Sequence, residues 1–159
     1  MKNFVKHYLV ALIPYFGVKI YYVREGEIMK ADLNKLQELC IKLGFDDVKL
    51  TEDKLEITLL KDIVLVIMNY EENNKEDSLI AFNDFPWHCH DEIKFVDTKH
   101  HYVELDYYEI IQGFYDGDIL VADLIENEEV TDRFPVHKDY CDDLDDLILG
   151  EALLIRRIR

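Results

Sequence analysis

The chain is poor in glycine, proline and basic side chains, and each shortage excludes a class of protein. Six glycines and three prolines among 159 residues are too few for a collagenous or low-complexity chain. A hydrophobic share of 49% is too high for an intrinsically disordered one. We therefore expect a single domain covering residues 1–159, a length that suffices for a hydrophobic core.

Cysteine is scarce as well, and the longest apolar runs are short. The three cysteines form no Cys-x-x-Cys pair, and their odd number suits a reducing compartment. The early apolar run Tyr8–Val18 contains Pro14 and is far shorter than the about 20 residues that cross a bilayer. We expect a cytoplasmic protein without a membrane anchor or a secretory signal. The same run predicts a hairpin of two strands, Tyr8–Ile13 and Val18–Val23.

Basic residues number only 18 against 34 acidic ones, and the excess of acid is confined to the second half of the chain. Residues 1–69 contain ten acidic and ten basic residues, whereas the rest of the chain contains 24 acidic and eight basic residues. The net charge of −16 disfavours nucleic-acid binding, which requires lysine and arginine to neutralise phosphates. It favours either a solubilising surface or a docking face for a basic protein partner.

The segment Glu104–Asp146 is the most acidic, with fifteen carboxylates against only Arg133 and Lys138. The candidate acidic face comprises Glu104, Asp106, Glu109, Asp116, Asp118, Asp142, Asp143, Asp145 and Asp146.

Local patterns predict several elements in the first half. Apolar residues at helical spacing predict a helix over 32–43, with Asp32 at its start, Gly44 at its end and Cys40 on its buried face. Alternation over Leu55–Leu59 predicts a half-buried strand. The unbroken apolar run Ile63–Met68 predicts a central strand covered on both sides. A turn at residue 62 is expected to precede that strand. The polar residues 71–78 predict a loop, and residues 79–82 predict another strand.

The second half predicts a helix followed by short strands. The helix begins near Leu105 and stops between Gly113 and Gly117. After it we expect a strand over 118–125, a polar connection over 126–133 and an extended piece over 134–137. A short acidic helix should follow Asp139. The chain is expected to end in a strand over 152–158 whose arginines are directed at the acidic body. We predict an α+β fold, with a mixed or mainly antiparallel sheet of about six to eight strands and about two or three helices packed on it.

The segment Phe85–Glu92 concentrates residues that can bind metals. In extended backbone His88 and His90 share one face while Cys89 points to the other. A third ligand could come from Asp91, His101 or Glu104. The candidate metal set is His88, His90, His101 and Glu104, with zinc or iron as the ion and no other cofactor expected. The alternative is a strand end where Trp87 packs in the core and the imidazoles bond to backbone or to nearby acids.

The same segment resembles, in part, the JAMM-type metalloprotease motif, an aromatic residue followed by His-Ser/Thr-His and then a serine and an aspartate. Trp87, His88 and His90 match. Three positions depart from the motif: Cys89 replaces the small hydroxyl residue, Thr98 the serine and His101 the aspartate ligand. The resemblance covers residues 87–101 only, so the activity of that family does not follow from it.

Two functions remain after these observations. The first is a non-catalytic binding protein, inhibitor-like or immunity-like, whose carboxylates dock a basic partner. The alternative is a small metal-dependent hydrolase that uses the His-x-His pair, with Glu92 accepting a proton from metal-bound water. Nucleotide and covalent mechanisms are disfavoured, because the chain has no glycine-rich phosphate loop and its one serine, Ser78, lies in no Gly-x-Ser-x-Gly motif. The oligomeric state is not predicted.

Overall fold

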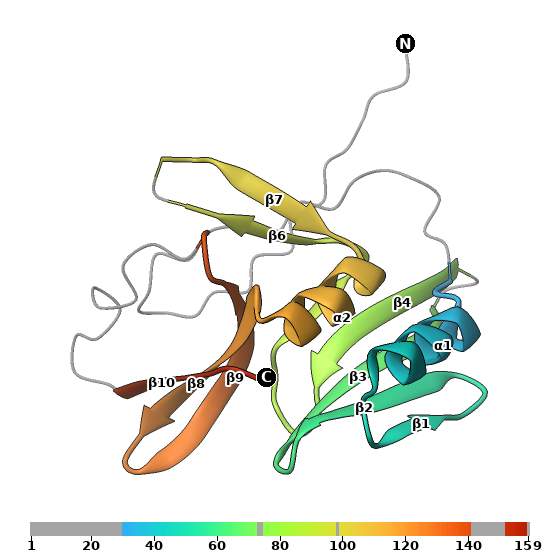
Figure 1. Ribbon diagram of the computed structural model, residues 1–159, viewed down its shortest axis with the longest axis horizontal. Coiled ribbons are helices and arrows are strands. Elements are labelled where there is room, and N and C mark those ends of the chain that lie inside the picture. The colour runs from blue at the N-terminus through green and yellow to red at the C-terminus, as the bar shows by residue number, and fades with distance from the viewer. Residues whose placement is uncertain (1–29, 73–74, 98, 141–151, 159) are drawn as a thin grey trace.

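The computed structural model describes residues 30–72, 75–97, 99–140 and 152–158. Within these residues ten strands form three antiparallel sheets, accompanied by two helices (Figure 1). The predicted α+β class with antiparallel strands is therefore confirmed. The strands are distributed over three sheets of five, three and two strands, whereas a single sheet was expected. The domain prediction for residues 1–159 stays a prediction.

The five-stranded sheet follows chain order, and its strands are β1 (Val48–Leu50), β2 (Lys54–Leu60), β3 (Ile63–Glu72), β4 (Lys75–Phe82) and β5 (His88–His90). A hairpin of β6 (Ile93–Val96) and β7 (Tyr102–Leu105) comes next. The three-stranded sheet has the order β10-β8-β9 and contains β8 (Ile119–Glu126), β9 (Glu129–His137) and β10 (Ala152–Arg156). The helices are α1 (Leu33–Leu43) and α2 (Tyr107–Asp116). Helix α1 covers the five-stranded sheet, and α2 lies between that sheet and the three-stranded one (Figure 1).

Helix α1 begins and ends where its sequence predicts. The Asp32 carboxylate accepts a hydrogen bond from the Lys35 amide at 3.1 Å, which satisfies one of the free amides of the first turn. Gly44 ends the helix in the left-handed region, with φ of 82°, where a side chain would be strained. Cys40 is fully buried on the inner face, and this burial raises the pKa of its thiol to about 12.

Helix α2 begins with a capping box and continues past its internal glycine. Asp106 and Glu109 each accept a hydrogen bond from the other's backbone amide, at 2.9 and 3.0 Å. The helix runs through Gly113 and stops at Gly117, whose φ is 76°. Glycine at position 113 allows α2 to approach β8 closely, since a Cβ at this position would be 2.5 Å from Cγ1 of Ile119.

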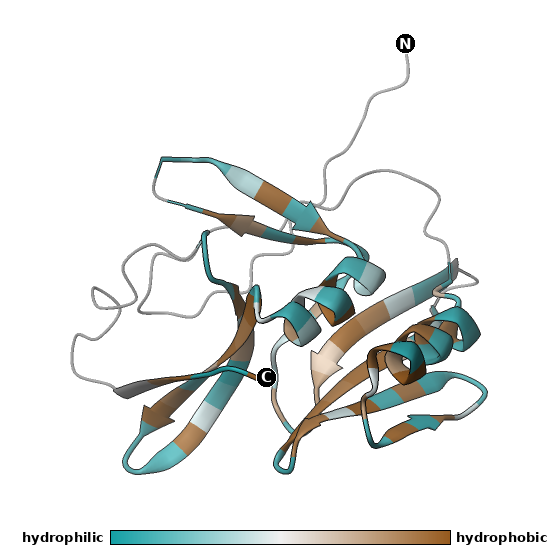
Figure 2. Ribbon diagram, in the orientation of Figure 1, coloured by the Kyte–Doolittle hydropathy of each residue, from teal (hydrophilic) through white to brown (hydrophobic). Residues whose placement is uncertain are grey.

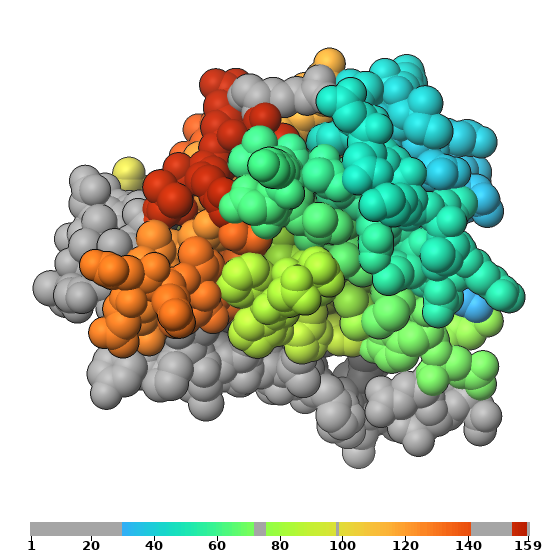
Figure 3. Space-filling model, turned by 90° about the horizontal axis from the view of Figure 1, so that it is seen from below, coloured from blue at the N-terminus to red at the C-terminus, as the bar shows by residue number. Residues whose placement is uncertain are grey.

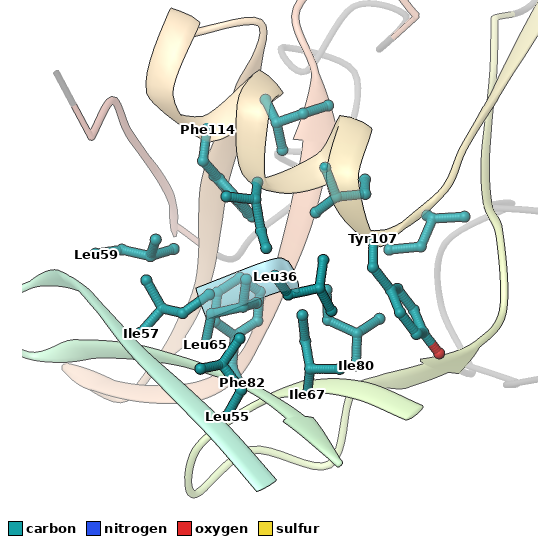
Figure 4. Packing of buried hydrophobic residues seen from close by; sticks show 14 of the residues in the cluster. Leu36, Leu55, Ile57, Leu59, Leu65, Ile67, Ile80, Phe82, Tyr107 and Phe114 are labelled. Atoms are coloured by element: carbon teal, nitrogen blue, oxygen red, sulfur yellow. The ribbon is translucent and has the colours of Figure 1, made fainter. Parts of the chain in front are cut away.

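The main core lies between the two helices and the inner face of the five-stranded sheet (Figure 4). Leu55, Ile57 and Leu59 point into it from β2, as their alternation predicts. Leu36 from α1 and Phe114 from α2 meet them from above (Figure 4). The strands beneath α1 carry long hydrophobic stretches, while both helices combine hydrophobic and hydrophilic bands (Figure 2). Removal of this apolar surface from water is the main term that stabilises the arrangement.

Strand β3 occupies the centre of the five-stranded sheet, as predicted, and Asp62 lies in the turn before it. Its residues alternate between buried and half-buried, so the second face, which was predicted to be covered as well, is only partly covered. The predicted loop over 71–78 is also wrong, because β3 and β4 pair as a hairpin, with Tyr70 opposite Asp77 and Glu71 opposite Glu76. Ladder hydrogen bonds join backbone groups, so polar side chains at the end of a hairpin do not prevent pairing.

Two buried polar residues attach the segment before α1 to this hairpin. Ser78 and Asn69 are both buried, and the Ser78 hydroxyl donates to the side-chain oxygen Oδ1 of Asn69 at 2.6 Å. The Ala31 amide donates to Ser78 Oγ at 2.8 Å, and the Asn69 amide group donates to the Ala31 carbonyl at 2.9 Å. The chain's one serine is therefore held in a structural network.

The second half contains more strand than predicted. The polar connection expected over 126–133 is wrong, because β9 already begins at Glu129 after a tight turn in which Asn127 and Glu128 have φ of 51° and 69°. The strand predicted over 134–137 belongs to β9, an outer strand of its sheet, where Pro135 is tolerated. The hairpin of β6 and β7 was not predicted.

Some predictions fall outside the described residues. These are the hairpin over 8–23 and the acidic helix after Asp139. Among the residues that the structure describes, neither helix combines the length and hydropathy needed to span a membrane.

An ionic cluster joins the two larger sheets. Asp123 on β8 is fully buried and pairs with Arg133 on β9 and Arg156 on β10. Arg133 Nη1 donates to the backbone carbonyl of Asp62, at 3.0 Å, and Arg156 Nη1 bonds to the Asp62 carboxylate at 2.6 Å. The cluster thus ties the three-stranded sheet to the turn between β2 and β3, which lies against it when the molecule is seen from below (Figure 3).

Candidate docking surface and histidine pair

The described members of the predicted acidic face are arranged along α2 and its two flanks. Glu104 lies on β7, Asp106 and Glu109 at the start of the helix, and Asp116 and Asp118 at its end. The spacing of 106, 109 and 116 places these carboxylates on one stripe of the helix. The stripe faces outward because the opposite side buries Ile110, Ile111 and Phe114. Asp142, Asp143, Asp145 and Asp146 lie outside the described residues.

Part of this acidic stripe borders a hollow of about 360 Å³ between α1, α2 and the end of β9. Its apolar lining comes from Leu39, Leu105 and Tyr108, and its carboxylates from Glu109, Asp116 and Asp118. An apolar surface with acidic groups at its margin matches the two parts of a lysine or arginine side chain, an aliphatic stem and a charged end.

The carboxylates around the hollow are neutralised unequally. Asp118 forms an ion pair with Lys138, which lowers the pKa of its carboxyl group. Outside the hollow, Glu104 pairs with Lys94 at 3.3 Å. The hydrogen bonds that the Glu109 and Asp116 side chains accept in the described structure come from neutral donors: the Asp106 amide, at 3.0 Å, and the Gln112 amide group, at 2.9 Å. Asp116 also lies at the C-terminal end of α2, where the helix dipole is negative. Arg157 Nη2 also reaches this helix end, where it donates to the Asp116 backbone carbonyl at 3.4 Å. Among the carboxylates of the hollow, Glu109 and Asp116 are therefore the two whose side-chain hydrogen bonds in the described structure come from neutral donors.

His137 lines the same hollow and was not singled out by its sequence context, since it is isolated in the chain. Its ring contacts Phe95 and Tyr140, with ring centroids 5.8 and 4.9 Å apart. The Asp139 amide donates to Nδ1 at 3.1 Å, an arrangement that requires the neutral imidazole. Burial lowers the pKa of this ring.

The predicted histidine pair lies on β5, on the outer face of the five-stranded sheet. The rings of His88 and His90 are adjacent, with centroids 5.6 Å apart, and Cys89 points to the other side, as the alternation predicts. Cys89 is buried, which raises its pKa to about 12. Trp87 packs against Phe82 in the core. These positions agree with the alternative interpretation of the segment, that of a strand end with one core aromatic.

Each imidazole is oriented by a hydrogen bond at Nδ1. His88 Nδ1 is 3.0 Å from the Pro86 carbonyl oxygen, and His90 Nδ1 is 2.8 Å from Asp77 Oδ2 and 3.0 Å from the Tyr70 hydroxyl. The Tyr70 hydroxyl donates to the same Asp77 oxygen at 2.5 Å, and the Ser78 amide donates to Asp77 Oδ1 at 2.7 Å. Sequence reasoning missed Tyr70 and Asp77, because it placed the segment after Tyr70 in a loop and so brought neither residue to β5.

The other residues of the predicted metal set are engaged elsewhere. His101 Nδ1 bonds to Asp97 Oδ2 at 3.0 Å, and Glu104 pairs with Lys94 across the β6–β7 hairpin. Asp91 donates its backbone amide to the Tyr107 hydroxyl at 3.0 Å, and burial raises the pKa of its carboxyl group. In the part of the chain that the structure describes, no three His, Cys, Asp or Glu side chains are grouped as metal ligands. The structure thus brings together His88 and His90 only.

Comparison with known proteins adds no relative: no protein-family model, no curated protein and no solved structure matches the chain.

Proposed function

We propose that this protein is a non-catalytic binding protein that docks a basic protein partner through the hollow beside α2. The supporting observation is the position of Glu109 and Asp116, two carboxylates hydrogen-bonded to neutral donors at the margin of an apolar depression. A lysine or arginine of the partner would lay its stem on Leu39, Leu105 and Tyr108 and bring its charge to the carboxylates.

The overall charge supports the same proposal through association kinetics. A molecule with a net charge of −16 attracts a basic partner at long range and so accelerates encounter when salt is low. An inhibitor-like or immunity-like role fits this pattern, since carboxylates can occupy the places where a basic enzyme receives phosphates. The unpaired, buried state of Cys40 and Cys89 accords with our placement of the protein in the cytoplasm.

A fluorescent peptide with several arginines tests the docking surface. We expect it to bind the wild-type chain at low salt, and to bind the double variant Glu109→Gln/Asp116→Asn at least about tenfold more weakly, a loss expected for two charge-assisted contacts. Both substitutions keep a side-chain oxygen that can accept the existing helix hydrogen bonds. Fluorescence anisotropy at low salt and at about 1 M salt, where the Debye length is about 3 Å, measures the electrostatic part.

The matched control is Glu128→Gln/Glu129→Gln, which changes the net charge equally at the exposed β8–β9 turn. We expect this control to bind almost as well as the wild type. Equal losses in both double variants would show that only the total charge matters and would refute the hollow as the docking site. Binding that is insensitive to salt would refute the electrostatic basis.

A further inference from the structure

The histidine pair on β5 forms a site of its own, separate from the hollow beside α2. His88 is exposed and His90 half-buried, and both side chains lie on the outer face of the sheet. Strand β5 is the last strand of the described five-stranded sheet. From the geometry of the two imidazoles we propose that His88 and His90 together bind one divalent transition-metal ion, Zn²⁺ or Cu²⁺.

The hydrogen bonds at Nδ1 prepare both rings for this role. A metal-binding histidine usually donates one ring N–H to a carbonyl or carboxylate, which leaves the other nitrogen with a free lone pair. His88 has the Pro86 carbonyl in this position, at 3.0 Å, and His90 has the Asp77 carboxylate, at 2.8 Å. With the Nδ1 proton directed at these acceptors, Nε2 of each ring is the ligand atom.

The separation of the rings fits one shared ion. Two imidazoles bound to one tetrahedral Zn²⁺ through bonds of about 2.1 Å have their ring centroids roughly 5 Å apart. The centroids of His88 and His90 are 5.6 Å apart without an ion, with the ring planes at 76° to each other. The observed separation is thus close to that of two imidazoles on one ion.

The surroundings are acidic, which favours a cation. Asp77 contacts His90 directly, and Asp91 and Glu92 follow His90 in the chain. The pair supplies two protein ligands, so the remaining coordination positions would hold water or a group from a bound molecule, as in open zinc sites.

Titration of the tag-free full-length chain with ZnCl₂ or CuCl₂, followed by calorimetry, tests the proposal. We expect one ion per wild-type chain and the loss of this stoichiometric binding in His88→Ala and in His90→Ala. Asp77→Asn should weaken the affinity by about tenfold or more without removing a ligand, the usual effect of changing a group that orients a metal-bound histidine. Electron paramagnetic resonance of the Cu²⁺ complex should show two imidazole nitrogens in the wild type and one in either alanine variant.

His101→Ala is the matched control, since it removes an exposed imidazole that bonds to Asp97 in the β6–β7 hairpin. It should bind the ion like the wild type. A wild-type chain that binds no ion, alanine variants that retain the stoichiometry, or an equal loss in His101→Ala would each overturn the proposal. Circular dichroism of every variant checks that the fold is kept.

Discussion

Asp123 and Arg133 lie directly opposite each other on β8 and β9, and both side chains are buried. Arginine Nε is 2.6 Å from Oδ1 of the carboxylate, and Nη2 is 3.2 Å from Oδ2, so the pair is bidentate. Arg156 from β10 bonds to the same carboxylate and also reaches Asp62 in the turn between β2 and β3. One buried carboxylate therefore holds two arginines from separate strands and links two sheets.

Asp123→Ala is expected to destabilise the protein by about 3 to 5 kcal/mol, because it leaves two arginines near the interior without their shared carboxylate. Urea unfolding followed by circular dichroism measures this change. The control is Asp116→Asn, an exposed position where we expect a change within about 0.5 kcal/mol. A loss below about 1 kcal/mol in Asp123→Ala would mean that the cluster contributes little to stability.

Gly113→Ala is expected to lower the free energy of unfolding by about 1 to 3 kcal/mol, since the new methyl group would collide with Ile119 on β8. The sign is informative, because in a helix without tertiary contacts alanine is more stable than glycine by about 1 kcal/mol. A double-mutant cycle with Ile119→Ala should recover part of the loss. An additive cycle would contradict the proposed contact between the helix and the strand.

Acidification is expected to destabilise the protein through His137. Burial lowers the pKa of this ring in the folded state, so the unfolded chain binds a proton more readily. The stabilising contribution of the neutral His137 ring is fully present above pH 6.5, the ordinary pKa of histidine. It is lost as the pH falls from 6.5 to the lowered pKa of the folded state. Asp118 and Asp139 oppose the shift, and Lys138 adds to it.

Urea midpoints at neutral and mildly acidic pH measure this effect of His137. In His137→Phe, which keeps an aromatic ring beside Phe95 and Tyr140, the loss of stability on acidification should be smaller than in the wild type. His100→Asn serves as the control, since this exposed position has a φ of 64°, which asparagine tolerates, and it should show the pH dependence of the wild type. An unchanged pH dependence in His137→Phe would refute the assignment.

Cys40 and Cys89 are expected to be unreactive in the folded protein. Burial raises the pKa of both thiols to about 12, so almost no thiolate is present near neutral pH. In a Cys141→Ser background, Ellman's reagent should react with the folded protein at least about a hundredfold more slowly than with the urea-unfolded protein. Equal rates would show that these cysteines are accessible in the folded state.

Local features were predictable because their physical basis lies within a few residues of chain. The Asp32 cap and the Gly44 end of α1, the alternation of β2, and the opposite orientations of Cys89 and its neighbouring histidines all follow from helix and strand periods. The polar hairpin of β3 and β4 was missed, since ladder pairing does not depend on hydrophobic side chains.

The sequence by itself determined the acidity of the chain, the bounds of α1 and the shared face of His88 and His90. Only the tertiary structure decided that Asp77 orients His90 and that Asp123 joins Arg133 and Arg156. It also decided that Glu109 and Asp116 border a hollow shared by α1, α2 and β9. These relationships depend on strand register and on how elements that are distant in the chain pack together. A helix cap or a hydrophobic period of two or 3.6 residues defines a helix or strand, but it does not indicate which distant element that helix or strand will contact.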